Sequence, residues 1–261
     1  MSTPDTLYTT DGPIATLAFN RQRARNAMTW AMYDALVDAC EAVDANPDVR
    51  VFVLRGADDQ AFVAGTDISQ FLELRNTEDA LAYEARLERV IDRLERVTKP
   101  TIARIQGAAV GGGCVIAIAC DLRICGPTAC FGVPIARTLG NCLSAANCAR
   151  LLDLVGPARL KEILFTARLI EAPEALAAGL ATQVVDSKVL DQVVADTAGT
   201  IATNAPLTIQ ATKELVRRVQ AHRRLETGLD HDLIDNCYTS HDFRGAVKSF
   251  LAKRQAVWTG R

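Results

Sequence analysis

The sequence predicts a mixed α/β core followed by a helical C-terminal region. Short apolar runs at 49–54 and 101–105 have the composition of buried strands, and the second run is bounded by Pro100 and Gly107. The segment 78–97 instead places its apolar residues at helical spacing, with charged residues between them. Strands that alternate with helices are typical of α/β proteins, and we therefore assign this class.

Turn residues and helix caps set the order of the elements up to residue 131. Asp-Gly-Pro at 11–13 separates two short apolar runs and predicts a hairpin, while Thr29 is placed to cap a helix that Asn-Pro at 46–47 ends. The run at 49–54 is apolar apart from Arg50, too apolar for a half-exposed strand, and is therefore expected to be a central strand. Strands are expected at 7–10, 14–19, 49–54, 101–105, 122–125 and 129–131. Helices are expected between 29 and 46 and at 68–74, 78–97 and 113–119.

The chain from residue 144 onward is expected to be mostly helical. Gly156 is expected to end the first of these helices, and Gly179 is expected to cap a later one. Helices are expected at 145–155, 160–165, 173–178, 189–202, 207–219, 224–237 and 244–257, with a lone strand at 182–185. One compact core does not need so many amphipathic helices. We therefore divide the chain into a core over residues 1–200 and a helical region over residues 201–261.

Composition and charge argue against several classes of partner. The chain of 261 residues is 49% hydrophobic, has a formal net charge of −2 and contains no block of basic residues, so no nucleic-acid partner is expected. No apolar run reaches the ~18 residues of a membrane span, and the first residues lack the pattern of a secretory signal. We therefore expect a cytoplasmic protein that has no membrane partner.

The eight cysteines are expected to be reduced thiols. No two of them form a C-x-x-C pair, so neither a disulfide framework nor a zinc site is expected, and we assign no metal. Most of these cysteines are expected to be small apolar fillers of the core.

The stretch from Thr101 to Cys120 carries the first functional signal. A buried strand leads into three consecutive glycines, Gly111 to Gly113, and then into a helix that is apolar on all sides. Glycines let a ligand approach the main chain closely, and the first N–H groups of a helix are free to bind negative charge. The same glycines are also compatible with tight packing alone. Their spacing fits neither a P-loop nor a dinucleotide-binding G-x-G-x-x-G turn.

A second turn of small residues occurs at 61–68, after the strand expected at 49–54. Its sequence, Ala-Phe-x-Ala-Gly-x-Asp-Ile, and the segment Lys-Pro…Gly-Gly-Gly-Cys…Cys-Asp-Leu-Arg at 99–123 resemble the enoyl-CoA hydratase/isomerase (crotonase) superfamily. Other landmarks of the superfamily follow in order: Asn-Ala-Met at 26–28, Phe-Gly-Val-Pro at 131–134, Ala-Gly-Leu at 178–180 and Phe-Leu-Ala-Lys-Arg at 250–254. The resemblance implies ββα units wound into a spiral, whereas periodicity alone is equally compatible with a doubly wound sheet.

The resemblance implies a coenzyme A thioester as the ligand, with coenzyme A carried by the substrate and no separate cofactor. Reactions of such thioesters pass through an enolate-like oxygen, which two backbone N–H groups can stabilise. The matching positions are Thr66 and Gly112, next to Asp67 and Gly111. The alternative is that both turns are ordinary parts of the core.

The resemblance also implies where the rest of coenzyme A binds. Adenine is expected against Val63 and Ala64, where small side chains leave room. The pyrophosphate needs cations, for which Arg25 is the first candidate and Lys253 or Arg254 the second. The alternative for each cation is a solvated surface residue. The C-terminal helices of this superfamily pack against neighbouring subunits, which implies a homotrimer or a dimer of trimers.

The chain departs from the superfamily at the two glutamates with which hydratases position and activate water. The matching positions hold Val115 and Ile135, or Ala136 if the second match is shifted by one residue. An apolar side chain cannot act as a general acid or base. Hydration by the usual pair of carboxylates is therefore not expected.

Three polar residues that follow the Phe-Gly-Val-Pro stretch are the remaining catalytic candidates. They are Arg137, Asn141 and Ser144. A cation such as Arg137 on a pocket loop either binds a carboxylate-bearing acyl group or pairs with a surface acid, and both alternatives stay open.

Two acids and two thiols match less specific positions. Asp67 and Asp121 correspond to acids that are common across the superfamily, and we expect them to be structural rather than catalytic. Cys114 and Cys142 are expected to be inert, because the three histidines all lie in the C-terminal helices and no Cys–His pair is indicated.

Two functions remain open from the sequence. The first is an enzyme of lyase, isomerase or decarboxylase type that stabilises a thioester enolate. Decarboxylation is attractive because loss of CO2 forms the enolate without a protein base. The second is a non-catalytic acyl-CoA-binding protein, which would bind the thioester without turning it over.

Overall fold

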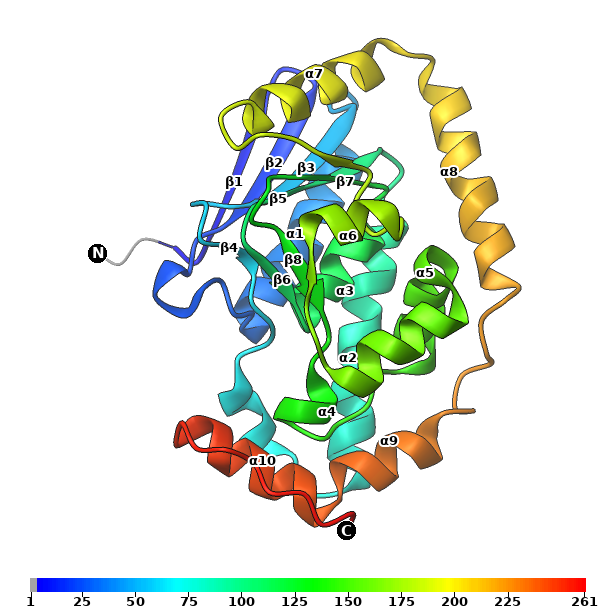
Figure 1. Cartoon of the computed structure of the whole chain (residues 1–261). Helices are drawn as coiled ribbons and strands as arrows, with labels where there is room; N and C mark the ends of the chain where they lie inside the picture. Colours follow the sequence, from blue (N-terminus) through cyan, green and yellow to red (C-terminus); the bar gives the residue numbers. More distant parts are fainter. Residues whose placement is uncertain (1–3) are drawn as a thin grey trace.

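The chain forms two β-sheets with helices packed around them (Figure 1). The computed structural model describes residues 4–261. In sheet order, the six strands of the larger sheet are β1 (Thr6–Asp11), β2 (Ile14–Phe19), β3 (Val51–Gly56), β5 (Thr101–Ile105), β7 (Leu122–Cys125) and β10 (Gln183–Val184). The four strands of the smaller sheet are β4 (Ala61–Val63), β6 (Ala108–Val110), β8 (Cys130–Gly132) and β9 (Ile170–Glu171).

From β3 to β8, successive strands alternate between the two sheets, which produces a repeated ββα unit. β3 joins the larger sheet and β4 the smaller one before helix α2 (Thr77–Glu95). The same order recurs in β5, β6 and α3 (Gly112–Ala119), and again in β7 and β8 before the next helices. The repeated strands pair in parallel within each sheet. This arrangement confirms the ββα spiral and excludes a doubly wound fold, in which one sheet would hold these strands.

Local sequence signals explain where the helices begin and what they bury. The Thr29 side chain accepts a hydrogen bond from the Met32 N–H and starts α1, as expected. Residues 113–119 of α3 are all buried, which explains why this helix is apolar on every side. The remaining helices are η1 (Gln22–Ala24), α1 (Trp30–Ala45), η2 (Ile68–Glu73), α4 (Ile135–Thr138), α5 (Ala145–Thr166), α6 (Ala172–Ala177), α7 (Leu190–Thr203), α8 (Pro206–Ala221), α9 (His231–Tyr238) and α10 (His241–Leu251).

The helices expected at 145–155 and 160–165 are both present within α5, and the break predicted between them is confirmed. Gly156 adopts non-helical dihedral angles, with a φ of 74° and a ψ of 166°, and separates the two helical segments there. Pro157 lies directly after the kink, where the helical hydrogen bonds are already interrupted, so its missing N–H costs little.

Two C-terminal helices are shorter than expected. The helix predicted at 224–237 is reduced to α9, because Gly228 with a φ of 95° lies in a run of turns before it. The helix predicted at 244–257 begins earlier, where Ser240 caps α10. It also ends earlier, just before Lys253 adopts a left-handed φ of 54°.

Helix α7 packs on the larger sheet, so the expected division after residue 200 falls inside a helix that belongs to the core. Val194 and Ala198 of α7 lie in one apolar cluster with Val51, Val53 and Ile102 of the sheet. The helix after α7, α8, does not pack on the larger sheet (Figure 1). The assignment of separate roles to the two regions stays a prediction.

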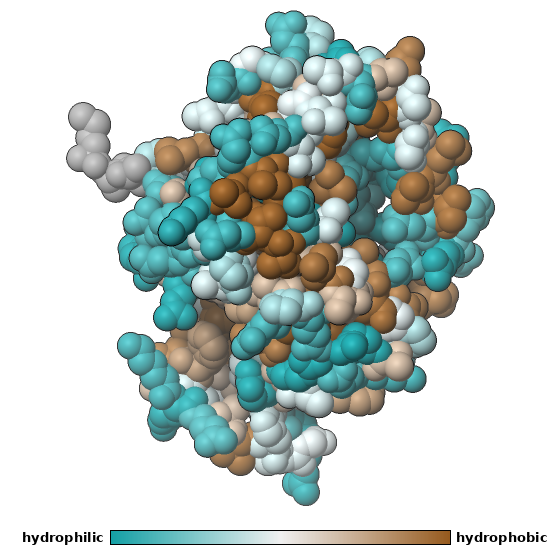
Figure 2. Space-filling view, turned by 45° about the horizontal axis from the view of Figure 1, so that its top comes forward, coloured by the Kyte–Doolittle hydropathy of each residue, from teal (hydrophilic) through white to brown (hydrophobic). Residues whose placement is uncertain are grey.

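Helix α8 runs along one side of the molecule and exposes much of its apolar surface. It has no fully buried residue, and Leu207, Leu215 and Val219 are all more than half exposed. Figure 2 shows hydrophobic side chains on the rim where α8 runs, beside a hollow in the surface. None of the helices in residues 4–261 combines the length and the apolarity that a membrane crossing requires.

Candidate active site

A cavity of about 500 Å³ opens where the two small-residue turns meet. It is lined by the turn at 64–68, the start of α3, one face of α2, the segment 133–143 and side chains of α9 and α10. Most of the lining residues are apolar, with a few polar groups among them. Mostly apolar cavities of this size with few polar groups are typical of small-molecule sites.

Strand pairing brings the two turns together. β4 pairs with β6 in parallel with Val63 opposite Ala109, so the chain leaves both strands at the same edge of the sheet. A further bridge joins Met28 to Thr66 and holds the first turn in place. A Cβ atom placed on Gly112 would lie 3.8 Å from the Thr66 nitrogen. The backbones of the two turns therefore lie next to each other at the cavity.

The N–H groups of Thr66 and Gly112 are free to bind a ligand. Within residues 4–261, neither group donates a hydrogen bond to another part of the chain. Gly112 is the first residue of α3, so its N–H has no partner within the helix, and it also lies at the positive end of the helix dipole. Both residues line the cavity. The arrangement can hold a developing oxyanion.

Gly112 and Gly113 are each needed for a different structural reason. A Cβ atom on Gly113 would lie 2.0 Å from the Val63 carbonyl oxygen, so this glycine permits tight packing of α3 on β4. A Cβ atom on Gly112 would lie 2.6 Å from the Tyr33 hydroxyl and 2.9 Å from Thr66 Oγ1. Gly112 therefore leaves room for these two hydroxyls beside the free N–H groups.

The tyrosines next to these turns add hydroxyl groups to the cavity wall. The hydroxyls of Tyr33 and Thr66 form a hydrogen bond of 2.8 Å. The hydroxyl of Tyr83 is buried, and within residues 4–261 it has no hydrogen-bond partner. Burial raises the pKa of both tyrosines, so the phenols stay protonated near neutral pH.

The positions of the missing glutamates lie in the cavity and are apolar. Val115, on the first turn of α3, and Ile135, at the start of α4, both line it. Ala136 is exposed. Neither lining residue can bind or ionise a water molecule, so this wall suits an apolar part of the ligand.

The three polar candidates after residue 134 occupy different environments. Arg137 is exposed and is not among the residues that line the cavity. Ser144 is buried and caps α5, where its hydroxyl accepts a hydrogen bond from the Asn147 N–H at 3.4 Å. Asn141 lines the cavity, and its Nδ2 donates to the Tyr238 hydroxyl at 3.1 Å. The structure thus places only Asn141 of these three at the cavity.

Of the residues proposed to hold coenzyme A, only Ala64 is itself part of the cavity lining. Val63 is buried behind it under α3. The carbonyl of Arg25 accepts a hydrogen bond of 3.0 Å from the Ala64 N–H. The side chain of Arg25 is exposed. Lys253 and Arg254 are exposed and come directly after residues 250–251, which line the cavity.

Asp67 follows Thr66 and caps the N-terminus of η2. Its carboxylate accepts a hydrogen bond from the Ser69 N–H at 3.0 Å and pairs with Arg21 at 2.7 Å. Burial alone would raise the pKa of Asp67, but the bonds from Ser69 and the charge of Arg21 outweigh it and lower the pKa. Asp121 similarly accepts hydrogen bonds from residue 101. Both acids thus have structural partners.

The two candidate thiols lack the features of nucleophiles. Cys114 is buried outside the cavity lining, and burial raises the pKa of its thiol to about 12. Cys142 lines the cavity, but the neighbouring thiol of Cys237 and burial raise its pKa as well. A thiol that stays protonated is a poor nucleophile.

The sequence analysis missed Glu84, a buried carboxyl in the cavity wall. The signal was present in the helix predicted at 78–97. Its apolar face includes Leu87, Val90 and Ile91, and one turn back from Leu87 that face reaches Tyr83 and Glu84. An acid on the buried face of a helix is uncommon and could have been singled out for that reason.

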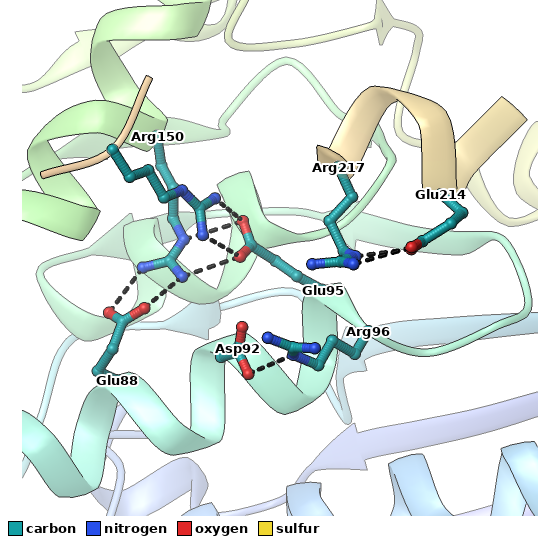
Figure 3. Close-up of polar contacts among 8 residues, drawn as sticks. Glu88, Asp92, Glu95, Arg96, Arg150, Glu214 and Arg217 are labelled. Carbon is teal, nitrogen blue, oxygen red and sulfur yellow. Dashed lines mark hydrogen bonds and ion pairs between the residues drawn. The ribbon is translucent and has the colours of Figure 1, made fainter. Parts of the chain in front are cut away.

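A buried ion-pair network fixes the helix that carries Glu84. Arg150 of α5 reaches across to α2, where its guanidinium donates to Glu88 at 2.6 and 2.8 Å and to Glu95 at 2.8 and 2.9 Å (Figure 3). The Arg150 side chain is only 2% exposed. Arg150 also donates to Asn147 Oδ1 at 2.7 Å, and Asn147 lines the cavity. The network therefore ties the cavity wall to two helices.

Known proteins with similar sequences and structures share this architecture. The sequence profile described as "Enoyl-CoA hydratase/isomerase" matches residues 9–261. The chain is 32% identical over 246 residues to the short-chain-enoyl-CoA hydratase of Clostridium acetobutylicum, which covers 94% of each chain. A solved enoyl-CoA hydratase/carnithine racemase of Magnetospirillum magneticum superposes with a TM-score of 0.80 at 34% identity, covering 100% of this chain and 97% of that one. A methylmalonyl-CoA decarboxylase in complex with 2-nitronate-propionyl-CoA superposes with a TM-score of 0.91 at 26% identity, covering 100% of both chains.

The fold, the paired turns and these matches define a protein of the crotonase class. The chain belongs to the enoyl-CoA hydratase/isomerase family. The family resemblance drawn from the sequence is thereby confirmed, and the finer question is which reaction this cavity supports.

Proposed function

We propose that the protein transforms an acyl-CoA through a thioester enolate held by the backbone N–H groups of Thr66 and Gly112, in a lyase, isomerase or decarboxylase type of reaction. The supporting observation is the cavity in which these two free donors lie opposite apolar residues at both glutamate positions, Val115 and Ile135. Backbone donors that are already in place stabilise charge as it develops and need no rearrangement.

Decarboxylation fits this cavity better than hydration. Departure of CO2 leaves its bonding electrons on the thioester, so the enolate forms without a base, and the two N–H groups supply the main stabilisation. Hydration needs groups that activate water, and neither Val115 nor Ile135 can do so. The similarity to a methylmalonyl-CoA decarboxylase supports the same choice, although several relatives are named hydratases.

A substrate panel tests the proposal. The protein is incubated with crotonyl-CoA, 3-enoyl-CoA, malonyl-CoA and methylmalonyl-CoA, without added metal or cofactor, and the products are followed by mass spectrometry. We expect loss of CO2 or isomerisation for at least one thioester. Rapid hydration of crotonyl-CoA would contradict the proposed reaction type. Binding of thioesters by calorimetry with no turnover of any panel member would instead favour the non-catalytic acyl-CoA-binding alternative.

We propose that the coenzyme A part is held at the mouth of the cavity, with adenine near Ala64 and the pyrophosphate on Arg25 or on Lys253 and Arg254. The exposure of these cations, and their closeness in the sequence to the lining residues Ala24, Phe250 and Leu251, support the assignment. Replacement of Arg25 by Ala should raise KM with little change in kcat, because the contact is the same in ground and transition states.

We propose that the protein is a homotrimer or a dimer of trimers in which neighbouring copies cover α8. The exposed side chains of Leu207, Leu215 and Val219 support this proposal, since exposed apolar surface of this kind marks protein interfaces. Light scattering after size exclusion should give three or six times the 28.2 kDa of one chain. A monomeric mass at micromolar concentration would contradict it.

A further inference from the structure

Glu84 is a buried acid that has no cationic partner. It is 8% exposed and lines the cavity, and within residues 4–261 no Lys, Arg or His forms an ion pair with it. Its neighbour one turn along, Glu88, instead pairs with Arg150. A buried carboxyl without a counter-ion lowers stability, and groups of this kind are typical of functional sites.

The polar groups around Glu84 form one connected cluster. The Tyr238 hydroxyl donates a hydrogen bond to Glu84 Oε1, and Asn141 Nδ2 donates to Tyr238 Oη at 3.1 Å. In residues 4–261 no group donates to Glu84 Oε2, and Asn141 Oδ1 and the Tyr83 hydroxyl are buried without partners. All four residues line the cavity. Unpaired polar atoms gathered in an otherwise apolar cavity indicate a place for a polar or reacting part of a ligand.

The cluster lies on the same cavity as the free N–H groups of Thr66 and Gly112. Tyr33 lines this cavity as well, and its hydroxyl forms a hydrogen bond of 2.8 Å with Thr66 Oγ1. Tyr33 would also be 2.6 Å from a Cβ on Gly112. The carboxyl and the two donors therefore belong to the wall of one cavity.

The protonation of Glu84 suits both acid and base roles. Burial raises the pKa of Glu84 to about 7, although the hydrogen bond from Tyr238 opposes this and the charges of Glu88 and Asp230 add to it. A group with a pKa near 7 is populated in both forms at neutral pH. The titratable groups that face or act on the Glu84 carboxyl are Tyr33, Tyr83, Glu88, Cys142, Asp230 and Tyr238.

We propose that Glu84 is the general acid–base of this cavity, that Tyr238 and Asn141 position it, and that it moves the proton at the α carbon of the bound acyl-CoA. The assignment rests on the proposed acyl-CoA function and adds the proton-transferring group that the glycine turns do not provide. When the enolate forms from the bound acyl-CoA, the Glu84 carboxylate removes the α proton. The C–H electrons form the C=C bond of the enolate, and the carbonyl π electrons move to the oxygen held by the N–H groups. After a decarboxylation, the carboxylic acid form returns a proton to the same carbon.

Deuterium exchange at the α carbon tests this step without knowledge of the natural acyl group. The wild-type protein is incubated with propionyl-CoA in D2O, and deuterium at the α carbon is followed by mass spectrometry. We expect Glu84→Gln to lower the exchange rate at least ~100-fold, since general acid–base groups contribute about this much or more. Calorimetry should show that propionyl-CoA binding changes less than about twofold. Glu78→Gln, an exposed acid on the same helix, is the matched control and should leave exchange unchanged.

The pH profile separates proton transfer from a merely structural role. Wild-type exchange should rise with pH through a midpoint near 7 as Glu84 ionises. Tyr238→Phe removes a hydrogen bond that favours the carboxylate, so it should move the midpoint to higher pH. This profile remains informative if Glu84→Gln fails to fold, which circular dichroism would reveal.

The outcomes distinguish the two proposals. Exchange or turnover by folded Glu84→Gln at the wild-type rate would overturn the role of Glu84 and leave the enolate proposal standing, as would a Tyr238→Phe profile with an unshifted midpoint. A wild-type protein that neither exchanges propionyl-CoA nor turns over any panel member would overturn both.

Discussion

The two functional ends of the cavity are built in different ways. At one end, backbone atoms of residues 65–67 and 111–113 provide the donors, and a sheet pairing and close-packed glycines fix them. At the other end, the side chains of Glu84, Tyr238 and Asn141 meet from three separate parts of the chain. The first end depends on local geometry, whereas the second depends on long-range packing, so substitutions should affect them differently.

Substitution at the backbone end should have the largest effect. Gly112→Ala places a methyl group 2.6 Å from the Tyr33 hydroxyl and 2.9 Å from Thr66 Oγ1, which fills the space beside both N–H groups. We expect the rate of enolate formation, measured by α-deuterium exchange, to fall about 100- to 1000-fold, as when an oxyanion donor is lost. Gly199→Ala in α7 is the control, because a Cβ there contacts nothing within 4 Å. Equal rates for the two variants would contradict the role of the backbone donors.

Loss of Arg150 should weaken the support of the side-chain end. Arg150→Met leaves Glu88 and Glu95 without their buried partner, and we expect the free energy of unfolding in urea to fall by about 3–5 kcal/mol. The exposed pair of Arg218 with Glu214 is the control, and Arg218→Met should cost less than about 1 kcal/mol. Similar losses in the free energy of unfolding would show that the buried network stabilises the fold no more than an exposed ion pair does.

The cost of losing Arg150 should depend on pH. Burial would raise the pKa of Glu95, but Arg150 and Arg224 outweigh it and hold the pKa below its usual value. A carboxylate with a lowered pKa in the folded protein stabilises the fold above the pKa of the unfolded chain, and this contribution disappears as the pH falls through the folded pKa. The difference between wild type and Arg150→Met should therefore be full near pH 7 and shrink below about pH 4. A difference that stays constant down to pH 3 would contradict the charge-based explanation.

Glu84 should have the opposite effect on stability. Its pKa in the folded protein is raised to about 7, so between pH 4.5 and 7 the unfolded chain releases a proton that the folded protein keeps. Wild-type stability should therefore fall over this interval relative to Glu84→Gln, by about 3 kcal/mol in total. Urea unfolding of both proteins at pH 4.5, 6 and 8 measures the effect. If the difference in free energy of unfolding between the two proteins does not vary with pH, the carboxyl ionises in the folded protein as it does in the unfolded chain.

The smallest effect is expected at a residue that belongs to neither end. Arg137 is exposed and outside the cavity lining, so Arg137→Ala should change kcat and KM for any accepted thioester less than about twofold. The sequence left open that this residue binds a carboxylate of the acyl group. A large rise in KM confined to carboxylated thioesters would restore that role.

The contrast between the two ends also explains what could be predicted from the sequence. The strand at 101–105, the capped helix after Thr29 and the glycine turn depend on neighbouring residues, and the structure confirms each of these elements. The resemblance supplied the ββα spiral, which periodicity could not distinguish from a doubly wound sheet. The helix break predicted at Gly156 is confirmed as well.

The side-chain end could not be assembled from local patterns. Tyr238 and Glu84 are 154 residues apart in the sequence, and only the packing of α9 on α2 brings them together. Nothing in the spacing of either helix predicts that contact. The attention given to Arg137 and Ser144 followed their position after residue 134, whereas the structure turns the first outward and uses the second as a helix cap.

An infrared spectrum of a bound thioester tests the backbone end most directly. Propionyl-CoA labelled with ¹³C at the thioester carbonyl is added to the wild-type protein and to Gly112→Ala, and the isotope-edited carbonyl stretch is compared with that of the free ligand. Two N–H donors on the carbonyl oxygen should polarise the bond, so the band should move to lower frequency in the wild type and move much less in the variant. A bound carbonyl whose stretch is the same as in water, or is shifted equally in both proteins, would contradict the oxyanion site at Thr66 and Gly112.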